Sequence, residues 1–313
     1  MCPFRIKIGN LIADIQANHS YVKKICEPYF SDEQAACKVV IEQKDIDNER
    51  NAVPEIRGET DLLPLGAEDR FLEVYALLHK LLEILPLYNM LFMHGSAIQM
   101  KGKAYIFIAP SGTGKSTHTR LWKERFGEEV TVINDDKPFL VFCNDKVYLC
   151  GTPWRGKHNI GQNLTAELGG ICILSRGEQN AIYPVDGGNA LQDIVRQCCL
   201  QRYKDNVLLA LDLIDKLLNL IPAYRLSCTP TLDAVDACYN EIIKERLGLN
   251  RAVFFAKNRE SAFVRFQFLV GVSGLKPEAV QALLEADASR ALRSAETARG
   301  WHPRDLGFYI PEK

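Results

Sequence analysis

Residues 105–117 read Y-I-F-I-A-P-S-G-T-G-K-S-T and combine three local signals. An apolar run typical of a β-strand leads into a glycine-rich turn, and a segment that favours a helix follows at 119–125. This is the order of the phosphate-binding motif G-x-x-x-x-G-K-[S/T], with Ala109 in place of the first glycine. The stretch therefore predicts a nucleoside triphosphate site; the alternative is an ordinary glycine-rich turn.

Each residue type in this loop suits a bound phosphate. Glycines at 112 and 114 let the backbone bend until its N–H groups converge on phosphate oxygens. Lys115 can reach the outer phosphates, and the Ser116 hydroxyl can bind Mg²⁺. The helix that follows directs its positive end at the anion. The predicted nucleotide-binding residues are Ser111, Gly112, Thr113, Gly114, Lys115, Ser116 and Thr117.

Two adjacent carboxylates follow the next β-branched run. Residues 130–133 (V-T-V-I) predict a strand that ends in Asn134-Asp135-Asp136. If this strand lies beside the strand that leads into the glycine-rich turn, its carboxylates face the phosphates at the same edge of the sheet. One carboxylate can then bind Mg²⁺, and the other can take a proton from an attacking hydroxyl. The alternative is a simple turn ahead of Lys137-Pro138.

The composition is that of an ordinary globular protein. Of the 313 residues, 47% are hydrophobic and 25% are charged, and the net charge is −1. This balance predicts neither a nucleic-acid partner nor a membrane partner, and no apolar run approaches the roughly 20 residues of a membrane helix. The ten cysteines form no C-x-x-C pair and no zinc-site spacing. We therefore expect a cytoplasmic location.

The hydrophobic patterns predict three regions: a small β-rich unit at 1–66, a nucleotide-binding domain at 67–245 and a mostly helical extension of unknown role at 246–313. The first unit is expected to hold a hairpin around Gly9-Asn10, a helix at 21–29, a strand at 37–43 and an exposed connection at 45–66.

The second region is expected to alternate strands and helices. Its predicted elements are a helix at 68–85, a strand pair that turns at Gly102, a hairpin at Asn144-Asp145, a polar loop at 151–163, strands at 168–174 and 225–228, and helices at 189–199, 206–219 and 232–243. The last region predicts a strand at 263–270 and helices at 277–284 and 289–297.

Three features in this order resemble the catalytic domain of HPr kinase/phosphorylase and its relatives. They are His94-Gly95, the loop P-S-G-T-G-K-S-T and the acidic pair Asp135-Asp136. The resemblance covers about residues 90–245, and the N-terminal unit is more loosely similar to that of HPr-kinase-like proteins from peptide-modification operons. It implies an α/β fold with a mixed sheet, whose nucleotide-binding P-loop core is shared with phosphoenolpyruvate carboxykinase.

The resemblance also implies roles for these residues. Asp135 would be the base that deprotonates the acceptor hydroxyl, and Asp136 would assist at the metal, together with Ser116, or at the attacking group. His94 would lie near the γ-phosphate; the alternative is a core histidine. Arg155 and Lys157 would supply positive charge to the transferring phosphoryl group, unless residues 151–163 form only a surface loop.

The expected activity is therefore that of an ATP- and Mg²⁺-dependent kinase that transfers the γ-phosphate to a hydroxyl. Residues 151–163 differ from those of the bifunctional members of the family. A serine of a peptide or small protein, or a free amino acid such as serine, is thus expected as acceptor in place of HPr itself. The resemblance also allows a homo-oligomer. Two alternatives stay open: a non-catalytic, regulatory nucleotide-binding module, and a carboxykinase-like enzyme that uses a small carboxylic acid.

Overall fold

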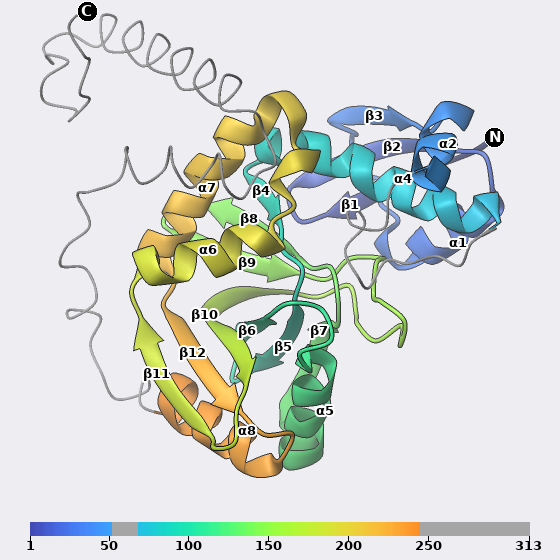
Figure 1. Ribbon diagram of the computed structural model, residues 1–313. Coiled ribbons are helices and arrows are strands. Elements are labelled where there is room, and N and C mark those ends of the chain that lie inside the picture. Colours follow the sequence, from blue (N-terminus) through green and yellow to red (C-terminus); the bar gives the residue numbers. More distant parts are fainter. Residues whose placement is uncertain (52–67, 245–313) are drawn as a thin grey trace, which may run out of the picture. The chain divides into compact units, whose positions relative to one another are not determined.

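The computed structural model describes residues 1–51 and 68–244, and the chain divides into two compact units, Met1–Phe255 and Ala256–Lys313 (Figure 1). Every element described below belongs to the first unit. The elements predicted at 263–270, 277–284 and 289–297 lie outside the described residues. The proposed boundaries near residues 66 and 245 stay a prediction.

A three-stranded sheet forms the N-terminal part, in the order β1-β2-β3. Strands β1 (Cys2–Ile8) and β2 (Leu11–Ala17) form the predicted antiparallel hairpin, and β3 (Cys37–Val40) runs parallel to β2. The turn uses Gly9 at φ +55°, a backbone conformation that side chains other than glycine rarely adopt. The alternation of apolar and polar residues buries one face of the hairpin, as the sequence predicts.

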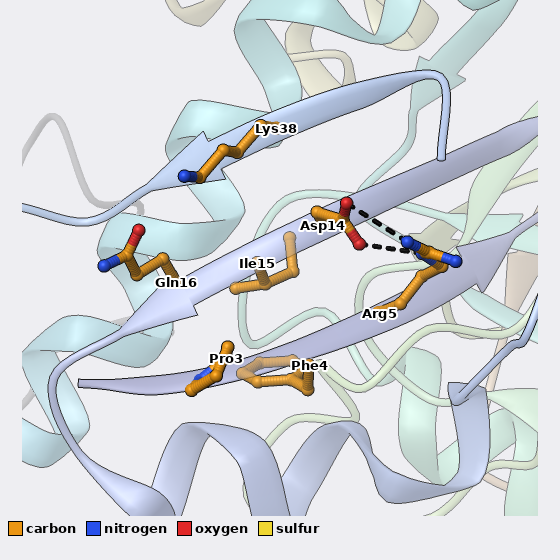
Figure 2. A pocket seen from close by; sticks show the side chains of 7 residues that line it. All are labelled: Pro3, Phe4, Arg5, Asp14, Ile15, Gln16 and Lys38. Atoms are coloured by element: carbon orange, nitrogen blue, oxygen red, sulfur yellow. Dashed lines mark hydrogen bonds and ion pairs between the residues drawn. The ribbon is translucent and has the colours of Figure 1, made fainter. Parts of the chain in front are cut away.

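The outer face of this sheet carries a shallow pocket (Figure 2). Arg5 and Asp14 lie opposite each other in the β1–β2 register, and Arg5 Nε donates to Asp14 Oδ1 at 2.7 Å across the pocket. Both side chains are partly exposed, so this ion pair contributes little stability. The pocket contains none of the predicted site residues.

The predicted exposed connection at 45–66 is wrong in its first part. Residues 45–51 belong to helix α2 (Gln43–Asn51), and residues 52–66 lie outside the described residues. The helix is polar on most of its surface, but it buries Ile46 and Glu49, and Glu49 Oε1 lies 2.5 Å from His79 Nδ1 on helix α4. Tertiary contacts of one buried face thus stabilise a helix whose overall polarity is typical of a loop.

Helix α4 (Asp69–Ile84) confirms the helix predicted at 68–85, and it packs against helix α1 (Ser20–Cys26). It buries a continuous apolar stripe that includes Leu77, Leu78 and Leu81. A short 3-10 turn, η2 (Leu85–Tyr88), replaces the helix at Pro86.

The second sheet is mixed and large, so the chain is a mixed α/β protein, as predicted. Its strands are β4 (Met90–Phe92), β5 (Ser96–Met100), β6 (Lys103–Ile108), β7 (Val130–Asn134), β8 (Phe139–Cys143), β9 (Lys146–Cys150), β10 (Thr165–Arg176), β11 (Ala181–Val185) and β12 (Ala223–Cys228). The order is β4-β8-β9-β10-β6-β5-β7, with β12 paired to β10 and β11 paired to β12. The sequence did not predict β11, an edge strand that contains Pro184.

One expectation about strand order is wrong. Strand β7 does not lie beside β6, because β5 lies between them and pairs antiparallel with both. Because β5 is antiparallel to both neighbours, β6 and β7 run in the same direction, and their carboxyl ends reach the same edge of the sheet. The expected juxtaposition of the two strand ends therefore holds by a different topology.

Helices cover this sheet in two groups (Figure 1). Helix α5 (Lys115–Phe126), helix α8 (Leu232–Cys238) and the π-helix Tyr239–Lys244 pack on a core that includes Phe107, Trp122 and Leu226. Helices α6 (Gly187–Gln197) and α7 (Val207–Leu220) pack together and confirm the two stripes predicted at 189–219. Among residues 1–51 and 68–244, no helix combines the length and apolar character of a membrane span.

Candidate functional site

A glycine-rich loop, residues 109–114, connects the end of β6 to the first turn of α5. Gly112 and Gly114 have φ of +73° and +121°, and nothing lies within 4 Å of where a Cβ atom would be. Glycine is thus required by the backbone conformation and not by crowding. Helix α5 starts at Lys115, so the residues predicted to bind nucleotide, 111–117, form the loop and the first helical turn.

The Lys115 side chain folds back under this loop. Its Nζ donates to the carbonyl oxygen of Ala109 at 2.9 Å and lies 3.5 Å from that of Pro110. Burial lowers the pKa of Lys115 to about 8, although the nearby carboxylates of Asp136 and Asp135 oppose this shift. The ammonium group is therefore held beneath the loop, within the electrostatic influence of the acidic pair.

Asp135 directly follows β7 in the chain, and its side chain lies near the first turn of α5. Ser96 Oγ donates to Asp135 Oδ1 at 2.6 Å, and the Ser116 hydroxyl lies near enough to the Asp135 carboxylate to lower its pKa. Thr119 Oγ1 lies 2.5 Å from Ser96 Oγ and extends this chain of hydroxyls along α5. Burial raises the pKa of Asp135 above its ordinary value, and the Ser96 and Ser116 hydroxyls only partly offset that effect.

Asp136 has a different environment. Its Oδ2 atom accepts from Lys137 Nζ at 2.5 Å, and its Oδ1 lies 3.3 Å from His94 Nε2. Asn134 Oδ1 accepts from the backbone N–H groups of Asp136 and Lys137 and fixes the turn. Burial opposes ionisation of Asp136, but Lys137 and His94 outweigh it and hold its pKa well below the ordinary value.

His94 lies beside Asp136, and its predicted place near a γ-phosphate stays a prediction. The backbone places His94 beside Asp136, because His94 N donates to Gln197 O at 2.8 Å and the next residue, Gly95, donates to Asp136 O at 3.0 Å. A Cβ atom on Gly95 would lie 2.9 Å from Ile106 carbons, so this close approach of β6 requires glycine. The structure thus brings together His94, Lys115, Ser116, Asp135 and Asp136.

The polar loop, residues 151–163, also packs on the acidic pair. Ile160 O accepts from Asp135 N at 3.1 Å, and Ile133 O accepts from Gln162 N at 2.9 Å. Gly156, at φ +67°, approaches so closely that a Cβ atom would lie 2.9 Å from Asp136 Cβ. Residues 157–160 between these contacts are exposed. Residues 156–159 form a turn in which Asn159 N donates to Gly156 O at 3.2 Å.

The two cations predicted in this loop have different surroundings. Lys157 is exposed in the turn beside the acidic pair. The Arg155 guanidinium lies next to the hydroxyl of Tyr29, a buried residue of the N-terminal part, where it opposes the effect of burial that raises the pKa of Tyr29 to about 12. Arg155 Nε and the Tyr29 hydroxyl are both buried and have no hydrogen-bond partner within residues 1–51 and 68–244. The predicted action of Arg155 on a phosphoryl group stays a prediction.

Sequence reasoning did not single out Ser96, Lys137 and Arg176, which contact the predicted site residues Asp135, Asp136 and Gly112. Ser96 directly follows His94-Gly95, and Lys137 directly follows the acidic pair, so their proximity along the chain was an available signal. Arg176 carries no such signal, because it ends a strand outside any motif and reaches the glycine-rich loop only through the pairing of β10 with β6.

Ser116 and Asp135 supply the oxygen atoms near the loop that could hold the predicted Mg²⁺. Among the described residues, no group of three or more His, Cys, Asp or Glu side chains is placed to hold a metal ion. Mg²⁺ commonly takes one or two protein oxygens together with water and phosphate oxygens. The carboxylate that reaches Ser116 is Asp135, and the predicted pairing of Ser116 with Asp136 at the metal stays a prediction.

The fold and this site define a mixed α/β protein with a glycine-rich loop and an acidic pair at one edge of its sheet. No family model matches the chain, and no curated protein matches it. The solved structure of the Hpr(Ser) kinase/phosphatase from Coxiella burnetii is similar at a TM-score of 0.30 and 9% sequence identity, over 50% of this chain and 98% of that chain. This similarity is a distant structural relationship.

Proposed function

We propose that this chain is an ATP- and Mg²⁺-dependent phosphotransferase that acts on a hydroxyl group. The observation that carries the proposal is the position of Asp135, whose buried carboxylate accepts a hydrogen bond from Ser96 and lies near the Ser116 hydroxyl at the start of α5. A nucleotide bound at the glycine-rich loop would need a metal ligand or a base beside the first turn of the following helix, and Asp135 lies there.

In this proposal, the loop amides and Lys115 hold the β- and γ-phosphates, and Ser116 with an aspartate holds Mg²⁺. Asp135 takes the proton of the acceptor hydroxyl, whose oxygen forms a bond to the γ-phosphorus while the bond from that phosphorus to the bridging oxygen breaks and ADP leaves. The raised pKa of Asp135 suits this carboxylate to proton transfer. The low pKa of Asp136 keeps that second carboxylate charged.

The acceptor would enter beside the turn at 156–159. Lys157 and His158 are exposed there, and the charge of His158 acts on Asp135. Positive charge near the transferring group stabilises the negative charge of its oxygens. A serine hydroxyl of a peptide, small protein or free amino acid is the acceptor class that we propose.

The test is phosphate transfer from ATP with Mg²⁺, measured by mass spectrometry on panels of amino acids and serine-containing peptides. Asp135→Asn is expected to abolish transfer while ATP affinity stays nearly unchanged, and Lys115→Ala is expected to weaken both. Asp14→Asn, which removes a carboxylate of the N-terminal sheet, serves as the matched control and should keep full activity.

Near-normal transfer by Asp135→Asn would reject Asp135 as the base. Unchanged ATP affinity in Lys115→Ala would reject the glycine-rich loop as the phosphate site. Tight ATP binding without transfer to any acceptor would favour a regulatory nucleotide-binding module.

A further inference from the structure

Arg176 contacts the glycine-rich loop from a neighbouring strand. Strand β10 runs parallel to β6 and pairs with it as far as Ile173 and Ile108, and it then continues to Arg176. The carboxyl end of β10 therefore extends past the point where β6 gives way to the loop. There, Arg176 Nη2 donates to Gly112 O at 2.5 Å.

The backbone of Arg176 is held by the sheet. Arg176 pairs with Cys228 at the end of the β10–β12 ladder, and the next N–H, that of Gly177, donates to Cys228 O at 3.2 Å. A Cβ atom on Gly177 would lie 1.9 Å from Ser227 Oγ, so a larger residue at this turn would require the Ser227 hydroxyl to move. A side chain presented by a strand end keeps its position better than one presented by a free loop.

The positive charge of Arg176 is not neutralised by a carboxylate within residues 1–51 and 68–244. Its side chain is exposed, and the contact with the Gly112 carbonyl uses one of its five N–H donors. Lys115, in contrast, is buried beneath the same loop and donates to Ala109 O and Pro110 O. The loop is thus flanked by one buried cation and one exposed cation.

We propose that Arg176 is a nucleotide-binding residue that exchanges the Gly112 carbonyl for the γ-phosphate of ATP. The inference rests on the proposed function and adds a residue to it. In the proposed function the loop amides and Lys115 hold the β- and γ-phosphates, and Arg176, exposed beside the same loop, would add a second cation at the γ-phosphate. A guanidinium group matches two phosphate oxygens at once, which a carbonyl oxygen cannot offer.

The test is calorimetric titration of Mg·ATP and Mg·ADP into the full chain and into Arg176→Gln, Arg176→Lys and Arg70→Gln. Arg70 is an exposed arginine of α4 paired with Glu68, and its variant is the matched control. Arg176→Gln is expected to weaken ATP binding about tenfold and ADP binding much less. Arg176→Lys, which keeps the charge but loses the fork, should fall between, and Arg70→Gln should leave both affinities unchanged.

Equal weakening of ATP and ADP binding by Arg176→Gln would overturn the proposal, because it would show that Arg176 only braces the loop. Unchanged affinities in both Arg176 variants would also overturn it. Absence of ATP binding by the unaltered chain would instead reject the proposed function, and the role of Arg176 with it. Thermal unfolding without nucleotide is expected to be the same for Arg176→Lys and the unaltered chain.

Discussion

Ser96 Oγ donates to Asp135 Oδ1 at 2.6 Å, across 39 positions of sequence, and both side chains are buried. The bond joins the first residue of β5 to the end of β7, the strand that pairs with β5. It stabilises the charged form of Asp135 against the effect of burial. The position and the protonation of this carboxylate therefore both depend on a serine hydroxyl.

Ser96→Ala is expected to move the acid limb of the pH–activity profile to higher pH. Loss of the hydrogen bond raises the pKa of Asp135 further, so a larger fraction of the base is protonated at low pH. A hydrogen bond to a charged group contributes about 1.5–3 kcal/mol, so kcat/KM on that limb should fall about tenfold or more. Thr119→Val, which removes the other partner of Ser96, is the control and should shift the limb less. An unshifted acid limb in Ser96→Ala would show that Asp135 is not the base that titrates on that limb.

ATP affinity is expected to fall as the pH rises above about 8. Burial lowers the pKa of Lys115 to about 8, so the unliganded side chain loses its proton above that pH, whereas a bound phosphate favours the charged form. Linkage of one proton limits the loss to about tenfold per pH unit. Titrations between pH 7 and pH 9.5 would measure it, with Lys115→Arg as the control, since arginine stays charged throughout. The same pH dependence in Lys115→Arg would contradict the assignment.

Lys137→Met is expected to destabilise the chain strongly. Lys137 and Asp136 are both buried, and removal of one partner of a buried ion pair typically costs about 3–5 kcal/mol. The double variant Lys137→Met/Asp136→Asn should regain part of that loss, because no unpaired charge is left. Urea unfolding measures the difference. Lys103→Met, which breaks the more exposed ion pair with Glu167, is the control and should cost less than about 1 kcal/mol.

Gly156→Ala is expected to lower activity, whereas Gly102→Ala is not. Both glycines have positive φ, +67° and +77°, so either substitution should cost about 1–2 kcal/mol of stability through backbone strain. Only at Gly156 would the new methyl group also meet Asp136 Cβ, at 2.9 Å, whereas nothing lies within 4 Å at Gly102. Equal turnover in the two variants would show that the polar loop does not control the acidic pair.

Patterns that depend on near neighbours were readable from the sequence. The hairpins at Gly9-Asn10 and Asn144-Asp145, helix α4 and the strand–turn–helix around Lys115 follow from alternation, helical periodicity and glycine. The polarity of residues 45–51 gave the wrong prediction of an exposed connection. These residues form a helix whose Ile46 and Glu49 are buried through contacts with the distant helix α4. A residue in contact with a distant partner carries no local sign of it.

The sequence was enough to predict which residues form the candidate site, whereas the different surroundings of each side chain depend on the tertiary structure. Lys115, Ser116 and the acidic pair follow from spacing alone. Strand order placed β5 between β6 and β7, and so brought Ser96 to Asp135. Side chains of adjacent residues leave the backbone in different directions, so Asp135 faces Ser116 while Asp136 faces Lys137. The approach of Arg176 to Gly112 depends on how far β10 extends past β6, which only strand pairing decides.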